Sequence, residues 1–301
     1  MPLTEPKPKK NCKLKPAPPL PLIQTASNEI YRFKGIFNGF CVVVEGEKDM
    51  KNLVTMGYFG KANLSRNYPQ FNEHKPEIVR KRVFQNRKNW SEKLSQTPQK
   101  IIVVPDSDSD NDDEYFTNLT PQYRLDRSAI KETVNLSLEE AFFLLAALNC
   151  LEISHEGVRL EATKAWDLFK RTDHYFVPNY VAYYYFRSKN WVVKNGIKFG
   201  GDFLLYKQGP PFYHASYVVI IHVVNERLEK IENFNRRSMI NIHLMGLNRL
   251  CETAGKDLLI CEIIWPSTTD QALVSADDVP KFSIKETIMK RWIPSQKRMN
   301  T

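Results

Sequence analysis

The chain has 301 residues, of which 42% are hydrophobic and 26% are charged, and its formal net charge of +9 suits a phosphate-rich partner without identifying one. No run approaches the roughly 18 apolar residues of a membrane-spanning helix, and the first residues lack the apolar core of a secretory signal. The five widely spaced cysteines include no CxxC pair, which argues against a disulfide framework or a cysteine zinc site and favours a reducing, intracellular compartment.

The first part of the chain is predicted to hold a tail, a small module and a linker. Residues 1–27 are rich in lysine and proline and lack apolar periodicity, so we expect a disordered basic tail. Residues 28–104 form the expected N-terminal α/β module, in which residues 40–44 predict a strand. Residues 105–120 begin with the run PDSDSDNDDE and are expected to be a flexible acidic linker that marks the domain boundary.

Helices are predicted for the next region, residues 121–185. Ser137 and Glu140 have the S-x-x-E spacing of a capping box, which predicts the start of a helix. Two further helices are expected over 161–171 and 178–189, and the second has a proline in its first turn, where proline is tolerated.

The last region, residues 186–297, is expected to hold a sheet. The dipeptide Asn195-Gly196 between residues 191–194 and 197–199 predicts a β-hairpin. Further strands are predicted from apolar runs, at 203–206, 217–224, 257–264 and 282–292. The run at 217–224 is apolar on both faces and is therefore expected at the centre of the sheet.

One long helix is predicted over 236–253, with Gly255 just beyond it as a C-terminal stop. Its apolar residues fall on one stripe that would pack on the sheet, namely Ile240, Leu244, Leu247 and Cys251. The expected fold class is therefore α/β, with a C-terminal domain in which a mixed sheet is covered by a long helix.

Three chemically versatile side chains fall at neighbouring strand ends. Tyr206 ends one predicted strand, the rigid turn 209–211 follows, and His214 stands at the entrance of the next strand. Lys256 follows the helix stop and begins another strand, so that it can reach the same edge of the sheet. Sites built on strand ends hold their geometry well, which favours these three residues as a catalytic group.

The three residue types suit cleavage of RNA without a metal or cofactor. RNA carries its own nucleophile, the 2′-hydroxyl, so the enzyme needs a base, an acid and a cation near the phosphate. We assign Tyr206 as base, His214 as acid and Lys256 as electrostatic stabiliser, with partial sharing of the first two roles left open. Because an unperturbed tyrosine has a pKa of about 10, we expect the nearby Lys256 to lower the pKa of Tyr206.

Each of these residues also has an ordinary structural interpretation. A tyrosine in a strand is usually part of the core, a single histidine is usually a hydrogen-bonded structural residue, and a lysine at a strand start is commonly solvated. Metal-dependent nuclease chemistry is disfavoured, because Pro105-Asp106 follows a strand without a downstream Asp/Glu-x-Lys. The six histidines show no His-x-x-x-His pair, which argues against a zinc hydrolase.

The longest distinctive segment is FRSKNWVVKNGIKFGGDFLLYKQGPPFYHASYVVI, residues 186–220. It resembles the catalytic subunits of the tRNA-splicing endonuclease, and most closely the subunit that cuts the 5′ splice site in the eukaryotic heterotetramer. The resemblance extends over nearly all of the chain beyond residue 27, through GYFGKANLSR (57–66), LSLEEAFFLLAALNCL (136–151) and IKETIMKRW (284–292). It implies an enzyme with a C-terminal nuclease domain.

The resemblance implies specific roles for five residues. The catalytic triad of the family matches Tyr206, His214 and Lys256, and the products would be a 2′,3′-cyclic phosphate and a 5′-hydroxyl. The arginine and aromatic residue that grip a bulged nucleotide match Arg249 and Trp292. Helix geometry independently places Arg249 away from the apolar stripe. The ordinary structural interpretation of the two residues is a solvated arginine and a tryptophan packed at the edge of the sheet.

The resemblance also implies precursor tRNA as substrate and an assembly as the working form. The expected assembly is a heterotetramer with one further catalytic and two structural subunits, in which the segment 284–292 pairs as an edge strand with Ile284, Ile288 and Trp292 on one face. A non-catalytic structural or RNA-binding subunit of the same complex is the alternative, but such subunits are expected to lack the triad. Nuclear localisation is expected from the substrate and from the basic tail. The alternative interpretation of that tail is a solvated basic segment with no targeting role.

Overall fold

The computed structural model describes residues 5–10, 17–25, 28–63, 99–101, 122–124 and 132–290. The chain divides into two compact units, one formed by Met1–Gly60 with Asn135–Thr301 and the other by Lys61–Val134. Within the described residues, no helix has the length and apolar character needed to cross a membrane.

The N-terminal part of the larger unit is a mixed sheet with strand order β6-β2-β1-β7-β8. Its strands are β1 (Phe33–Phe37), β2 (Val42–Val44), β6 (Val134–Leu136), β7 (Leu151–His155) and β8 (Val158–Leu160). Strand β1 pairs antiparallel with β2 and parallel with β7. The sheet therefore joins strands from the predicted N-terminal module with strands from the predicted helical region.

Two of the three helices of this part begin where the sequence predicts them, and α1 was not predicted. They are α1 (Glu47–Thr55), α3 (Leu138–Phe142) with a π-helical turn at Phe143–Ala147, and α4 (Ala162–Thr172). The predicted capping box is confirmed, because the Ser137 side chain accepts from the Glu140 backbone and the Glu140 carboxylate accepts from the Ser137 backbone. Aromatic side chains fill the core beside α3, where Phe142 lies 5.0 Å from Trp166 and 4.9 Å from Tyr180 between ring centroids.

The smaller unit is described in three short strands. They are β3 (Lys61–Ala62), β4 (Gln99–Ile101) and β5 (Gln122–Arg124), and β4 pairs antiparallel with β5. The predicted acidic linker, residues 105–120, lies outside the described residues.

The C-terminal part of the larger unit is a five-stranded mixed sheet with the order β13-β12-β11-β10-β9. Its strands are β9 (Val192–Asn195), β10 (Phe203–Tyr206), β11 (Tyr217–Val224), β12 (Asp257–Ile264) and β13 (Ser283–Met289). Strands β11 and β12 run parallel, and the other neighbours pair antiparallel. The prediction that 217–224 is central is confirmed.

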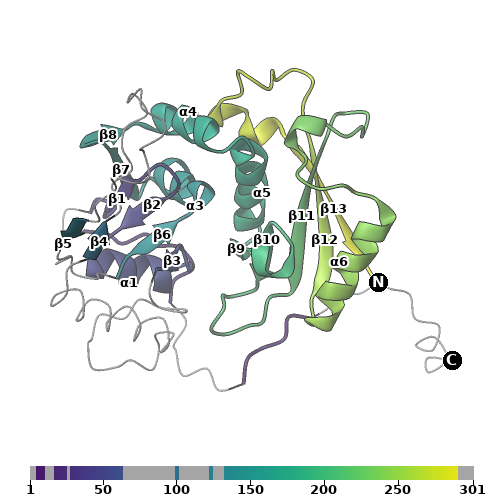
Figure 1. Ribbon diagram of the computed structural model, residues 1–301, viewed down its shortest axis with the longest axis horizontal. Coiled ribbons are helices and arrows are strands. Elements are labelled where there is room, and N and C mark those ends of the chain that lie inside the picture. Colours follow the sequence, from purple (N-terminus) through teal and green to yellow (C-terminus); the bar gives the residue numbers. More distant parts are fainter. Residues whose placement is uncertain are drawn as a thin grey trace. The chain divides into compact units, whose positions relative to one another are not determined.

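Two helices flank this sheet, α5 (Phe176–Ser188) and α6 (Asn241–Thr253), as Figure 1 shows. Leu204 packs in a cluster with Cys251 of α6, whereas the neighbouring Phe203 lies 6.0 Å from Tyr183 of α5 between ring centroids. Because successive side chains of a strand point to opposite faces, the two helices cover opposite faces of the sheet. This double cover explains why β11 is apolar on both faces.

Two predictions for this region are corrected by the structure. Residues 197–199 form a 3-10 turn rather than the second strand of a hairpin, and β9 pairs with β10 instead. The predicted hairpin turn would need positive φ at both central residues, but Gly196 has φ −95° and the Asn195 side chain accepts from the Ile197 backbone. Helix α6 starts at Asn241 rather than 236, so Ile240 is its N-cap, 59% exposed, and leaves the predicted stripe.

Candidate active site

The strand register places two of the three predicted residues, Tyr206 and Lys256, at the same end of the C-terminal sheet. Leu205 lies opposite Tyr217, and Tyr217 lies beside Asp257. One position further toward the edge, Tyr206 and Lys256 therefore flank the residue that precedes β11, and His214 is two residues before that position. Ser216, the residue that precedes β11, donates its N–H to the Leu205 carbonyl at 2.9 Å and accepts from the Asp257 N–H at 3.0 Å, which fixes this row.

Tyr206 is the last residue of β10, and its half-buried ring packs on the core cluster between the sheet and α6. Burial raises the pKa of the Tyr206 phenol above its usual value of 10.0. Among the described residues, no cation offsets this increase of the pKa. The expectation that Lys256 lowers the pKa of Tyr206 is therefore wrong. Tyr206 therefore stays neutral at pH 7.

Lys256 is positioned by the end of helix α6. Gly255 has φ +66°, the left-handed conformation that glycine adopts beyond helix ends, and the Lys256 backbone N–H donates to the Cys251 carbonyl at 2.9 Å. The Lys256 ammonium donates to the Ala254 carbonyl at 2.8 Å and lies 4.2 Å from the centroid of the Phe199 ring. Partial burial lowers the pKa of Lys256 below its usual 10.5, while proximity to Cys251 opposes the shift.

His214 is exposed on the loop 207–216 that connects β10 with β11. Gly209 starts the turn with φ +114°, a conformation that side chains rarely adopt, and its carbonyl accepts from the backbones of Phe212 and Tyr213. The Tyr58 ring fills the space above this glycine, because a Cβ added at Gly209 would lie 2.3 Å from Tyr58 Cε2. Tyr58 also makes an edge contact with Phe212, with 6.5 Å between ring centroids. The loop is therefore shaped by a residue far away in sequence.

Tyr58 is itself held by side chains of α5 and β9. The Arg187 guanidinium donates to the Gly57 carbonyl at 2.7 Å, and the Lys194 ammonium donates to the carbonyls of Tyr58 and Gly60, both at 2.7 Å. Lys194 also pairs with the Glu140 carboxylate at 3.1 Å. Nothing in the sequence analysis indicated that the segment GYFGKANLSR supports the His214 loop.

A second support of the loop comes from the N-terminal tail. The Lys9 backbone N–H donates to the Phe212 carbonyl at 2.7 Å, and the His214 N–H donates to the Lys7 carbonyl at 3.1 Å. Pro8 and Tyr213 form an antiparallel bridge between these two bonds. These contacts of residues 5–10 were not predicted, because nothing in a polar segment indicates which backbone it will pair with.

The structure places only one of the two predicted nucleotide-gripping residues. Arg249 is exposed on α6, as predicted from the helix geometry. Trp292 lies outside the described residues.

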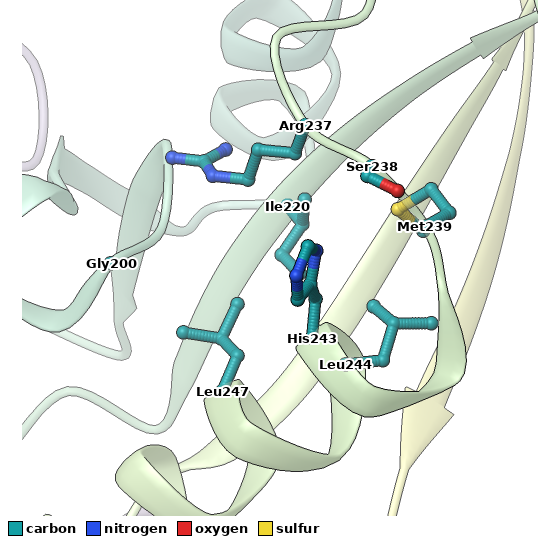
Figure 2. A pocket seen from close by; sticks show the side chains of 8 residues that line it. All are labelled: Gly200, Ile220, Arg237, Ser238, Met239, His243, Leu244 and Leu247. Carbon is teal, nitrogen blue, oxygen red and sulfur yellow. The ribbon is translucent and has the colours of Figure 1, made fainter.

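A separate pocket with a volume of about 360 Å³ opens at the other end of α6. Figure 2 shows His243, Leu244 and Leu247 of the helix on one side of it and Arg237 on the other. The Arg237 guanidinium is paired with the Asp202 carboxylate at 2.6 and 2.7 Å, so most of its charge is compensated. The pocket contains none of the three predicted catalytic residues, and Lys256 follows the opposite end of the helix.

Comparison with known families finds two matching domains in the chain. Residues 176–262 match the family described as tRNA intron endonuclease, catalytic C-terminal domain, and residues 33–166 match tRNA intron endonuclease, N-terminal domain. The first match includes Tyr206, His214 and Lys256. The fold and the two matches define the class of chains that carry both tRNA intron endonuclease domains.

Individual relatives agree with this class. Over 207 residues the chain is 39% identical to tRNA-splicing endonuclease subunit Sen2 of Gallus gallus, covering 68% of this chain and 44% of that protein. It is 30% identical to subunit Sen2-1 of Arabidopsis thaliana, covering 56% of this chain and 68% of that protein. It is 27% identical to the probable subunit sen2 of Schizosaccharomyces pombe, covering 86% and 84%.

The chain belongs to the tRNA-splicing endonuclease subunit family. The match spans less than half the length of its vertebrate relatives, 44% of the Gallus gallus protein and 36% of the Rattus norvegicus protein.

Proposed function

We propose that the chain is a catalytic subunit of a tRNA-splicing endonuclease that cuts intron-containing precursor tRNA at the 5′ splice site without a metal. The observation that carries this proposal is the strand register of the matched catalytic domain, which places Tyr206 and Lys256 on either side of one position, with His214 two residues before it. The names of the Sen2 relatives support the substrate class and the subunit character.

The proposed reaction is an internal transfer of the phosphoryl group. The 2′-oxygen next to the cut forms a bond to phosphorus, and the bond from phosphorus to the 5′-oxygen breaks. One proton leaves the 2′-hydroxyl and one is delivered to the departing 5′-oxygen. The products are a 2′,3′-cyclic phosphate and a 5′-hydroxyl, and no outside reagent is consumed.

Tyr206 and His214 supply the two proton transfers, with Tyr206 as base and His214 as acid. The exposure of His214 on its loop supports a role in direct contact with a bound RNA strand. Because burial raises the pKa of Tyr206, its ionised form is scarce at pH 7, which makes the base role demanding. The exchanged assignment, with His214 as base, is therefore the alternative that an experiment must separate.

Lys256 stabilises the charge that gathers on the phosphate oxygens. Its ammonium is held close to the helix end by Ala254, so little rearrangement is needed when the charge develops. Its partial burial removes competing water and strengthens the attraction.

The subunit is proposed to act in a nuclear heterotetramer with one further catalytic and two structural subunits. Strand β13 lies at the edge of the sheet and pairs on one side with β12, which leaves an edge for a strand of a partner. The RNA-gripping roles of Arg249 and Trp292 belong to the same proposal, supported by the exposure of Arg249 on α6.

The first test is cleavage of an intron-containing precursor tRNA in EDTA by the reconstituted complex. We expect the wild-type chain to cut the 5′ site and His214→Ala to lose roughly 10²–10⁴-fold in rate at that site only. Inhibition by the chelator, or normal 5′ cleavage by His214→Ala, would contradict the proposed chemistry and favour a structural subunit.

A substrate with sulfur in place of the 5′-oxygen separates the two proton-transfer roles. A departing thiolate needs no proton, so this substrate should restore cleavage to the variant that lacks the acid. We expect rescue of His214→Ala and no rescue of Tyr206→Phe. The opposite pattern would exchange the two assignments.

A further inference from the structure

The N-terminal segment 5–10 forms a short strand against the loop that carries His214. Two backbone hydrogen bonds, at 2.7 and 3.1 Å, flank the antiparallel bridge between Pro8 and Tyr213. Residues opposite each other in an antiparallel pair project to the same face, so Lys7 shares a face with His214 and Lys9 shares one with Phe212. The backbone pairing thus places lysines beside the proposed catalytic histidine.

The sequence of this segment, EPKPKK, keeps it extended. Pro6 and Pro8 fix their φ near −65° and disfavour helical conformations of the residues before them. A stiff segment loses little conformational entropy when a ligand binds, and it holds its side chains at fixed spacing. The lysines are therefore presented to a ligand on a pre-formed strand.

The lysines of the segment are exposed. Lys7, Lys9 and Lys10 are exposed, as is Lys207 on the His214 loop. Among the described residues, none of these four lysines forms an ion pair with a carboxylate, and Glu5 is the only acidic residue of the segment. Such a cluster attracts a polyanion, and its position at the proposed cleavage site favours RNA phosphates over an acidic protein surface.

We propose that residues 5–10 form a phosphate-binding strand that holds the RNA backbone beside His214. This inference rests on the proposed function, because it takes its ligand from the proposed reaction. The lysines contact the RNA in the bound state and in the transition state alike, so they contribute to affinity rather than to the rate of the bound complex.

The test uses the reconstituted complex with the full chain and a Lys7→Gln/Lys9→Gln/Lys10→Gln variant. Binding is measured with precursor tRNA that carries a 2′-deoxyribose at the 5′ splice site and so cannot be cut there. We expect the Kd to rise about tenfold or more and the slope of log K against log salt to fall by about 2, at roughly 0.7 for each lost phosphate contact. Cleavage of the normal substrate at saturation should stay within about twofold of wild type.

A matched control removes the same charge elsewhere. Lys48, Lys51 and Lys164 are exposed on helices α1 and α4 of the N-terminal part, and their joint change to Gln should leave the Kd nearly unchanged. An equal loss of affinity in this control would show an effect of net charge and overturn the proposal.

A backbone variant separates RNA binding from support of the loop. Lys9→Pro removes the N–H that donates to Phe212, whereas Lys9→Gln keeps it. If the triple Gln variant binds like wild type while Lys9→Pro alone lowers the maximal rate, the strand only positions His214 and the phosphate-binding proposal is wrong. Because the binding assay needs no cleavage, failure of the proposed reaction and failure of this inference remain distinguishable.

Discussion

The two flanks of the proposed active site are built in different ways. Lys256 is held by its own neighbourhood, through the carbonyls of Cys251 and Ala254 and the left-handed Gly255. His214 stands on a loop whose shape depends on Tyr58 and on residues 7–9, segments remote in sequence. The difference teaches that one half of the site is a local property of a helix end, whereas the other is a property of the folded unit.

This contrast predicts which substitutions each flank will feel. Changes at Tyr58 or in its anchors Arg187 and Lys194 should disturb the His214 loop while the Lys256 turn stays in place. Changes at the end of α6 should disturb the Lys256 turn while the His214 loop stays in place. The following experiments test that division.

The largest effect is expected for Lys256→Met in the reconstituted complex. Loss of the ammonium next to the developing phosphate charge should lower the single-turnover rate at the 5′ site by about 10²–10³-fold. The free energy of unfolding should change by less than about 1 kcal/mol, because the side chain is partly solvated and donates one hydrogen bond. Lys164→Met, which removes an exposed lysine from α4, should leave the rate unchanged.

A smaller effect is expected when the remote support of His214 is disturbed by Gly209→Ala. The new Cβ would meet the Tyr58 ring at 2.3 Å and would sit at φ +114°. We expect the maximal rate to fall about tenfold, and the free energy of unfolding to fall by about 1–3 kcal/mol from backbone strain.

A double variant decides whether the ring contact causes this loss. Adding Tyr58→Ala to Gly209→Ala removes the clash but not the positive φ, so the pair should be less impaired than the sum of the two single variants. Additive losses would show that the Tyr58 ring does not shape the loop, and the contrast between the two flanks would lose its basis.

Two helix ends and most strands of the C-terminal sheet could be predicted from the sequence. The capping box of Ser137 and Glu140 and the stop at Gly255 depend on residues a few positions apart. The strands at 203–206, 217–224 and 257–264 follow from continuous apolar runs. Tyr206 ends one of these strands and Lys256 precedes another, so their common row followed from the strand predictions.

The features that were missed depend on contacts between distant segments or on competing local hydrogen bonds. The Asn195 side chain caps a 3-10 turn and so displaces the predicted hairpin, a choice that strand propensity does not reveal. The packing of the Tyr58 ring against Gly209 and the raised pKa of Tyr206 both arise from contacts in the folded chain. No pattern in GYFGKANLSR indicates that its turn reaches the His214 loop.

The pH dependence sharpens the description of the Lys256 flank. Burial lowers the pKa of Lys256 below 10.5. As the pH rises through this lowered pKa the charge is lost, and the cleavage rate should then fall about tenfold per pH unit. Between the lowered pKa of Lys256 in the folded chain and its usual 10.5, the unfolded chain binds more protons than the folded chain. In that range of pH, stability should rise with pH while activity falls. Lys256→Arg keeps its charge to higher pH and should remove the alkaline fall of the rate. An unchanged alkaline limb in Lys256→Arg would assign that limb to another group.

The smallest effect is expected at the glycine that ends α6. Gly255→Ala places a side chain at φ +66°, where no heavy atom lies within 4 Å, so the change should cost about 1–2 kcal/mol of conformational strain without a clash. Gly246→Ala, in the interior of α6 and equally open, should instead stabilise the chain by about 0.5–1 kcal/mol. Thermal unfolding of both variants measures this difference in sign. A loss of rate in Gly255→Ala that does not add to the loss in Gly209→Ala would show that the change acts through His214. The two flanks would then be coupled through the sheet edge rather than built independently.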